Sequence, residues 1–234
     1  LDWAKVGGYR KGDNPARWQG NLEHRLAKPT KITKRQQHPA LPLADMPRFM
    51  DALRLRTGSA RALEFLILTA TRSNEVREAT WAEIDLNANT WTIPAERMKA
   101  DREHVVPLAP KAVSLLKALP RFAGTDLVFP GAKRKELSDA TLAKAIKLMD
   151  ANDVDAGGKG YKDPKQNNRV AVPHGFRSTF RDWCSERTAY PRDVAEMALA
   201  HAIADKTEAA YRRGDLFTKR TKMMNDWARF IDAK

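Results

Sequence analysis

Apolar residues recur every three or four positions over most of this 234-residue chain, which is the spacing of an amphipathic helix. The first clear stripe consists of Leu43, Met46, Phe49, Met50 and Leu53. Asp45 and Pro47 favour a helix start there, as an N-cap and a first-turn residue, and Gly58 favours its end. Ser59 then precedes the apolar run ALEFLILTA, which predicts a buried helix, and Ser73 precedes a third helical segment, NEVREA.

A different period appears between residues 81 and 108. The segments WAEIDL, WTIP and VVPL are short and are separated by the polar stretches NANT and KADREH, so they predict three antiparallel strands. Helical spacing returns at 110–118, 138–149, 174–187, 191–199, 205–213 and 218–232, with a strand-like LVFP between the first two. The whole pattern predicts a mainly α protein with a small three-stranded antiparallel sheet, which is an α+β fold.

Three segments depart from this pattern. Residues 1–26 hold a Gly-Gly pair and a short helix predicted from Pro15, with Trp18, Leu22 and Leu26 on one face. Residues 27–40, AKPTKITKRQQHPA, lose all apolar periodicity and carry four Lys or Arg, which predicts a basic linker. Residues 150–170 hold three glycines and few apolar residues, which predicts a surface loop.

The charge balance narrows the class of partner. Lys and Arg number 42 against 29 Asp and Glu, a net charge of +13 that is dispersed along the chain. A phosphate backbone is the commonest partner for such an excess, although basic proteins that bind no nucleic acid also exist. The single cysteine, Cys184, excludes an internal disulfide and a cysteine-rich zinc site. No apolar run approaches a bilayer span and no signal peptide opens the chain, so we expect a cytosolic protein without membrane contact.

Several side chains suited to phosphate chemistry stand at defined places. Arg72 ends the buried apolar helix, and Glu75 is placed to pair with it, unless the two form only a surface ion pair. Lys99 lies in the turn between two predicted strands, where lysines are usually only solvated. His174 and Arg177 are three residues apart, so that one helix face presents both to one phosphate.

His201 and Tyr211 follow in the segment LAHAIADKTEAAYRR. A phenol with a pKa near ~10 is a poor nucleophile at neutral pH and needs neighbouring cations or a base to become one. The alternative is a half-buried tyrosine whose hydroxyl caps a helix. The local sequence leaves both interpretations open.

In this order the set resembles the tyrosine recombinase (bacteriophage integrase) family. The resemblance spans roughly residues 40–234, and the sequence is most similar to integrases of prophages and integrative islands. The segment TATRSNEVREATWAEIDL resembles the first arginine box, MKADREHVVPL the strand-turn lysine, HGFRSTFRDW the His-x-x-Arg box and LAHAIADKTEAAYRR the box of the second histidine and the nucleophile. The resemblance implies the family's catalytic-domain fold. It also implies a catalytic set of Arg72, Lys99, His174, Arg177, His201 and the nucleophile Tyr211, with Glu75 in support.

The implied activity is site-specific recombination of double-stranded DNA at attachment sites, for the integration or excision of a prophage or genomic island. Tyr211 would form a 3′-phosphotyrosyl intermediate, and a 5′-hydroxyl would reverse the step, so that no metal, ATP or other cofactor is required. The arginines would neutralise the phosphate, Lys99 would protonate the leaving oxygen and His174 would assist Tyr211. The expected DNA contacts are Lys31, Lys34, Arg35, Lys159, Lys162, Lys165, Arg169 and Arg212.

The resemblance also implies a domain organisation and an assembly. Residues 1–26 resemble the end of a core-binding domain, 27–40 an interdomain linker and 41–234 a catalytic domain. We expect weak, salt-sensitive DNA binding and little recombination from residues 1–234 alone. The implied assembly is a homo-tetramer on DNA at the bacterial nucleoid, with accessory directionality or DNA-bending proteins as further partners.

Three questions stay open at this point. A type IB topoisomerase uses a similar set of arginine, lysine and tyrosine to relax supercoils. A non-catalytic DNA-binding module would need only the basic surface. The last predicted helix, 218–232, carries an apolar stripe that would be buried either in its own chain or on a neighbouring protomer; the stripe consists of Met223, Met224, Trp227, Phe230 and Ile231.

Overall fold

The computed structural model of the protein describes residues 1–27, 37–201 and 214–233. It divides into two compact units, Leu1–Gln37 and His38–Lys234. The helix expected at 205–213 lies outside the described residues.

The first unit contains little regular structure. It consists of α1 (Asp2–Val6), which the sequence pattern did not predict, and the 3-10 helix η1 (Leu22–His24). The helix predicted from Pro15 is wrong, because turns occupy this stretch and the side-chain carboxylate of Glu23 accepts the Gly20 N–H at 2.5 Å. Leu26 is 53% exposed, so the expected apolar stripe has no core to pack against.

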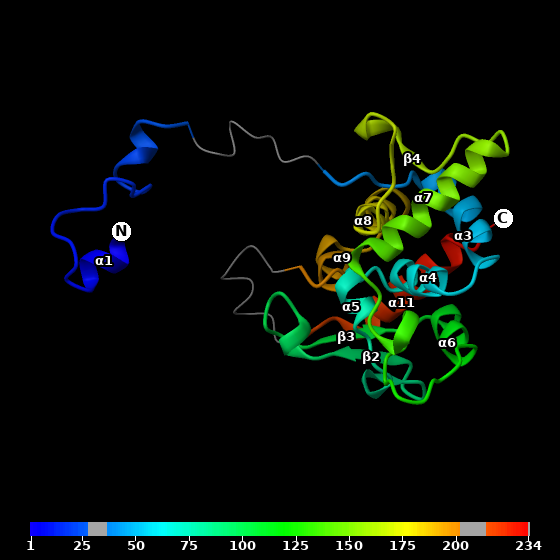
Figure 1. Ribbon diagram of the computed structural model, residues 1–234. Coiled ribbons are helices and arrows are strands. Elements are labelled where there is room, and N and C mark those ends of the chain that lie inside the picture. The colour runs from blue at the N-terminus through cyan, green and yellow to red at the C-terminus, as the bar shows by residue number, and fades with distance from the viewer. Residues whose placement is uncertain (28–36, 202–213, 234) are drawn as a thin grey trace. The chain divides into compact units, whose positions relative to one another are not determined.

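The second unit is mainly helical (Figure 1). Its helices are α3 (Met46–Arg54), α4 (Ser59–Thr69), α5 (Ser73–Arg77), α6 (Pro110–Lys117), α7 (Asp139–Asp155), α8 (Gly175–Arg187), α9 (Arg192–Ala198) and α11 (Phe217–Phe230). Short 3-10 helices are η2 (Leu43–Asp45), η3 (Trp81–Glu83), η4 (Ala95–Arg97), η5 (Ala132–Arg134) and η6 (Pro164–Gln166). None of the helices in the described ranges is long and apolar enough to cross a membrane.

The predicted three-stranded antiparallel sheet is confirmed. Its strands are β1 (Ile84–Asp85), β2 (Thr90–Ile93) and β3 (His104–Pro107), in the order β1-β2-β3. In the register of β2 and β3, Trp91 pairs with Val106, and Trp91 is fully buried. The LVFP segment is not a strand, because only Leu127 forms a bridge, to Thr80.

The surface loop predicted at 150–170 is partly wrong. Helix α7 continues to Asp155, and a hairpin of β4 (Lys162–Asp163) and β5 (Arg169–Val170) follows. Tyr161, which lies between α7 and β4, is only 2% exposed. The acidic residues of the segment bond inward, since Asp150 accepts the Tyr161 N–H at 2.6 Å and Asp153 accepts the Gly160 N–H at 2.9 Å. Composition alone makes these carboxylates look solvated.

The residues predicted to end α3 and to cap α4 have different roles in the structure. Helix α3 already ends at Arg54, and Gly58, with φ of 65°, is the N-cap of α4. Ser59 is therefore the first residue of α4 and not its cap. Asp45 does occupy the N-cap position of α3, but its carboxylate pairs with Lys159 Nζ at 2.6 Å.

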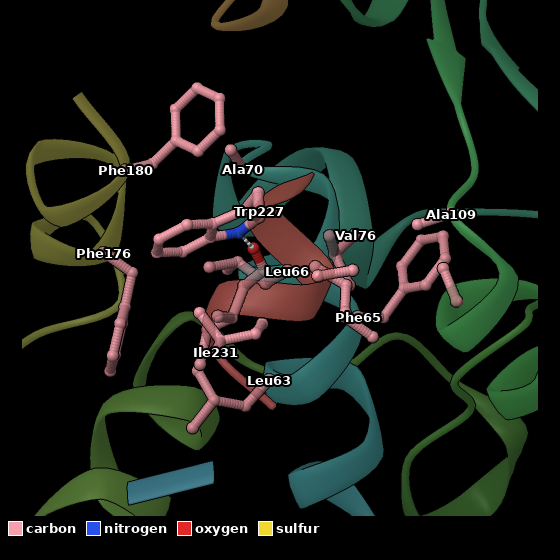
Figure 2. Packing of buried hydrophobic residues seen from close by; sticks show 14 of the residues in the cluster. Leu63, Phe65, Leu66, Ala70, Val76, Ala109, Phe176, Phe180, Trp227 and Ile231 are labelled. Carbon is pink, nitrogen blue, oxygen red and sulfur yellow. Dashed lines mark hydrogen bonds between the residues drawn. The ribbon is translucent and has the colours of Figure 1, made fainter. Parts of the chain in front are cut away.

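Helix α11 runs through the core of the second unit and packs against α4, α9 and β3 (Figure 1). The Trp227 indole N–H donates to the Ile67 carbonyl of α4 at 2.8 Å, as Figure 2 shows. Met223, Met224, Trp227 and Ile231 are each at most 1% exposed. Full burial of each such side chain contributes roughly 2 kcal/mol. The stripe of the last predicted helix is therefore core of its own chain.

Candidate active site

Two helix C-termini supply backbone carbonyls to one place. Helix α4 is followed by Ala70 and α9 by Ala200, and both alanines have left-handed backbone angles, with φ of 53° and 49°. At the end of α9, the Ala200 N–H donates to the Met197 carbonyl at 3.1 Å and the His201 N–H to the Glu196 carbonyl at 2.9 Å. This pair of bonds is a Schellman turn. Such turns leave the last carbonyls of a helix free for other donors, and the helix dipole makes them attractive to cations.

Arg177 of α8 binds these carbonyls. Its Nη1 donates to the Ala70 carbonyl at 2.6 Å and its Nη2 to the Leu199 carbonyl at 2.5 Å. The residue is 4% exposed, and no carboxylate in the described part of the chain forms a salt bridge with it. Burial, and then the charge of Arg72, lower the pKa of Arg177 to about 10. The guanidinium is thus still charged at neutral pH, and carbonyls position it without neutralising it.

Arg72 lies at the start of α5 and bonds to the same turn. Its Nη2 donates to the Ala200 carbonyl at 3.3 Å, and its Nη1 pairs with Glu75 Oε1 at 2.7 Å. The other oxygen of Glu75 accepts the Arg72 backbone N–H at 2.7 Å. The expected ion pair is present, but only one oxygen of the carboxylate binds the guanidinium. Glu75 therefore fixes both the backbone and the side chain of Arg72.

His201 completes a chain of contacts with Arg177. Its Nε2 lies 3.1 Å from Arg177 Nη2, and its Nδ1 lies 2.6 Å from Glu196 Oε2. The other oxygen of Glu196 accepts a hydrogen bond from Arg181 Nε at 2.8 Å. Side chains of α8 and α9 thus hold the imidazole on both nitrogens.

His174 stands at the N-cap of α8, and its ring lies edge-on to His38, with 4.7 Å between ring centroids. Burial, assisted by the charge of Arg177 and then by His38, Arg72 and His201 nearby, lowers the pKa of His174 to about 4. A neutral imidazole at pH 7 is able to accept a proton. The arrangement therefore gives this site one candidate base beside two arginines.

The chain around His38 is fixed against the start of α8. The Pro39 carbonyl accepts the Val172 N–H at 3.2 Å, and the Leu41 carbonyl accepts the Thr179 hydroxyl at 2.8 Å. A Cβ on Gly175 would lie 1.9 Å from the Pro39 oxygen, so only glycine fits there. We call residues 38–41 the strap; it sets His38 beside His174.

The structure gathers four of the predicted catalytic residues and their supporting carboxylate. Arg72, His174, Arg177, His201 and Glu75 meet around the ends of α4 and α9. Lys99 is exposed in the turn between β2 and β3, and no hydrogen bond or ion pair in the described part of the chain joins it to this group. Tyr211 lies outside the described residues.

The residues predicted to contact DNA fall into two groups. Lys159, Lys162, Lys165 and Arg169 lie on or next to the β4–β5 hairpin, which leads directly into His174. Of these, Lys159 pairs with Asp45. The remaining predicted contacts lie outside the described residues; they are Lys31, Lys34, Arg35 and Arg212.

Sequence reasoning missed three polar residues near the site. Glu196 precedes His201 by five residues, which is not a same-face helix spacing, and only the Schellman turn brings the two together. His38 was counted as part of a linker. His104 of β3 is half-buried, and its partial burial, with the charge of Arg220, lowers its pKa to about 4 against the opposing effect of Glu75. A histidine at the start of an apolar strand was the only signal for it.

Metal coordination finds no support in these side chains. Within the described ranges, no group of three or more His, Cys, Asp or Glu residues is arranged to hold a metal ion. The chemistry of the site rests on guanidinium and imidazole groups, which bind anionic oxygens.

Comparison with known sequences gives consistent matches. A model described as the phage integrase family matches residues 40–215. The chain is 36% identical to prophage integrase IntZ of Escherichia coli strain K12 over 206 residues, which cover 86% of this chain and 47% of the relative. It is 32% identical to the integrase of Enterobacteria phage P4 over 219 residues, or 86% of this chain and 47% of that protein. The chain thus spans about half the length of these relatives.

Comparison with solved structures shows a shared fold. The integrase from mycobacterium phage Brujita matches with a TM-score of 0.56 and 19% identity, over 99% of this chain and 72% of that one. The XerA recombinase matches with a TM-score of 0.55 and 18% identity, over 86% and 70%. A lambda integrase dimer bound to a COC′ core site gives 0.55 and 15%, over 86% and 67%. The α+β architecture is therefore that of solved integrases and recombinases.

Proposed function

The chain belongs to the phage integrase family, and on that premise we propose that it is the catalytic part of a tyrosine-type site-specific DNA recombinase. Its substrate would be double-stranded DNA at attachment sites of a prophage or genomic island. The reaction would be strand cleavage and rejoining by transesterification.

The observation that supports this proposal most strongly is the pair of arginines around two helix ends. Arg177 is buried and charged, yet its described partners are carbonyls and an imidazole, and only Arg72 has a carboxylate partner. Such a site has unneutralised positive charge that an anion can satisfy. A phosphodiester gains further negative charge on its non-bridging oxygens in the transition state, so this arrangement stabilises that state more than the ground state.

We assign the reaction steps as follows. The phenol oxygen of Tyr211 attacks phosphorus, the bond to the 5′ oxygen breaks, and a 3′-phosphotyrosyl link forms. Neutral His174 takes the phenol proton, and Lys99 gives a proton to the departing oxygen. The reverse attack by a second 5′-hydroxyl completes strand exchange. The bond energy is kept in the covalent intermediate, so the scheme needs no nucleotide or metal.

The proposal extends to organisation and partners. Residues 1–26 would belong to a core-binding domain and 27–40 to the linker, so that residues 1–234 alone would bind DNA weakly and recombine little. The basic side chains expected to contact DNA would follow the phosphate backbone. One lambda integrase structure is a tetramer bound to a Holliday junction. By analogy we propose a homo-tetramer on DNA in the bacterial cytoplasm, with accessory directionality or DNA-bending proteins.

The test is covalent capture of DNA. The full-length protein is incubated with a pool of nicked duplexes of random sequence, and DNA that stays attached after denaturation is recovered and sequenced. We expect a recovered site that Tyr211→Phe, which lacks only the hydroxyl, does not capture. Equal adduct from both proteins, or none from either, would refute the nucleophile assignment.

Two further assays distinguish the two alternatives. A topoisomerase would relax a supercoiled plasmid that lacks the recovered site as fast as one that carries it. A non-catalytic binding module would retain DNA in native gels but form no denaturation-resistant adduct. Family membership favours neither.

A further inference from the structure

We propose that Glu196 is a positioning residue for His201: its carboxylate sets which ring nitrogen carries the proton and supports the doubly protonated ring when phosphate binds. This inference rests on the proposed function, because it deepens the role of one residue of that site. It concerns the second histidine only and makes no use of Tyr211.

The hydrogen bonds around His201 determine its tautomer. A carboxylate can only accept a hydrogen bond and a guanidinium can only donate one. Glu196 Oε2 lies 2.6 Å from Nδ1, and Arg177 Nη2 lies 3.1 Å from Nε2. The neutral ring must therefore carry its proton on Nδ1 and turn its Nε2 lone pair toward Arg177.

Glu196 is itself held by several groups. Arg181 Nε donates to Oε1 at 2.8 Å, and Arg192 Nε lies 3.6 Å from the same oxygen. Burial raises the pKa of Glu196, but hydrogen bonds and charges from His201 and Arg181 outweigh it and lower the pKa overall. The backbone bond from His201 N–H to the Glu196 carbonyl, 2.9 Å long, ties the two residues a second time. The carboxylate is thus ionised and has little freedom to turn away.

Phosphate binding changes what Nε2 must do. An anionic oxygen placed against Arg177 and His201 accepts hydrogen bonds, so a bare Nε2 would repel it. The ring becomes a donor to this oxygen when it takes up one proton at Nε2, while its Nδ1–H stays hydrogen-bonded to Glu196. Glu196 and the bound phosphate favour that cationic ring, whereas the charges of Arg72, Arg177 and a protonated His174 oppose it.

Glu196→Gln separates this role from simple packing. The amide is close to isosteric, but Arg181 only donates and so holds the amide oxygen, which turns the NH₂ group toward His201 Nδ1. Nδ1 must then accept, and the proton moves to Nε2, where it meets Arg177 Nη2–H donor to donor. The substitution also removes the negative charge that supports the cationic ring.

The experiment measures single-turnover adduct formation by the full-length protein across pH. We expect Glu196→Gln to lose roughly 10- to 100-fold in rate, the usual range for a residue that orients a site group. The alkaline side of its pH–rate profile should become shallower than that of wild type, because the neutral ring of the variant already carries its proton on Nε2 and needs no second proton to donate to phosphate. The matched control is Arg192→Gln, which alters an exposed partner of the same carboxylate and should cleave within about twofold of wild type. A Glu196→Gln rate and profile equal to wild type would overturn the inference.

A second measurement does not depend on cleavage. Nitrogen-15 shifts of histidine-labelled protein, with the His201 signals assigned by His201→Asn, report the tautomer. We expect an Nδ1–H ring in wild type and an Nε2–H ring in Glu196→Gln, with melting temperatures within a few degrees. An Nε2–H ring in wild type would overturn the inference. The expected tautomer in a protein that forms no adduct would instead refute the proposed function and uphold the contact between Glu196 and His201.

Discussion

Two groups of arginines in the second unit are held in opposite ways. Arg54 and Arg61 share Glu64, whose oxygens they bind at 2.8 and 2.7 Å, and Arg54 also pairs with Asp232 near the end of α11. Each guanidinium there faces a carboxylate. Arg177, in contrast, binds the carbonyls of Ala70 and Leu199. Carboxylates balance the positive charge of the first group, whereas no carboxylate among the described residues balances the charge of Arg177.

The pKa values express the same contrast. Burial lowers the pKa of Arg54, but hydrogen bonding and charge from Glu64, followed by Asp232, outweigh it, so that the net shift is upward. The pKa of Arg177 is lowered to about 10 by burial and by Arg72. Arg54 is therefore neutralised by its carboxylate partners, whereas the charge of Arg177 is left for an anion. Three substitutions test this reading.

The largest effect is expected from Arg177→Lys. Lysine keeps the charge but cannot reach two carbonyls and a phosphate in a fixed plane. We expect single-turnover adduct formation by the full-length protein to fall by roughly a thousandfold or more, the scale of losing a placed transition-state cation. The free energy of unfolding in urea should fall by about 1–3 kcal/mol, because at least one buried carbonyl loses its donor, and the adduct rate is therefore compared per folded molecule. A lysine variant that cleaves as fast as wild type would remove the distinction between the two groups.

The next effect is expected from Arg54→Met. It leaves Glu64, which is 5% exposed, with one arginine instead of two, and leaves Asp232 with Lys111 alone of its two ion-pair partners in the described chain. We expect the free energy of unfolding in urea to fall by about 3 kcal/mol, with DNA binding per folded molecule unchanged. The matched control is Arg229→Met, an exposed ion pair with Asp226, which should change stability by less than about 0.5 kcal/mol. Comparable losses from both would contradict the assigned structural role.

The smallest effect concerns acid stability near the charged group. His104 has a pKa of about 4, below its ordinary value of 6.5, so the unfolded chain binds a proton that the folded chain refuses between these two values. Stability therefore falls as pH falls through that window, by about 2 kcal/mol between pH 7 and pH 5. His104→Gln should lose this part of the pH dependence in urea titrations. Because all carboxyl groups are common to both proteins, an identical slope would mean that His104 titrates normally.

The sequence predicted the helices and strands better than the contacts between them. Apolar residues at three- and four-residue spacing located α3 and α4, and the change of period located the sheet. These signals are reliable because an element that buries one face repeats apolar residues at the period of that element. The order of Arg72, His174, Arg177 and His201 predicted a shared site, and the structure brings these four together. That prediction came from the resemblance to the recombinase family, because local spacing paired only His174 with Arg177 and Arg72 with Glu75.

Other features depend on contacts that no local pattern records. Glu196 reaches His201 through a turn closed by Ala200, an alanine in a conformation that sequence reasoning would assign to glycine. Gly175 looks like an ordinary helix residue until the Pro39 oxygen occupies the space of its Cβ. Asp150 and Asp153 look solvated in the sequence, but they accept the backbone N–H groups of Tyr161 and Gly160. In each case the partner lies on another element or comes from the fold itself.

The strap has a practical meaning for anyone who trims this chain. A fragment that begins at Leu43, where the periodic pattern starts, would lose the acceptors of the Val172 N–H and the Thr179 hydroxyl. It would also uncover Gly175, the most flexible residue type, at the first turn of the helix that carries Arg177. The working boundary of the second unit is therefore His38, five residues before its first apolar stripe.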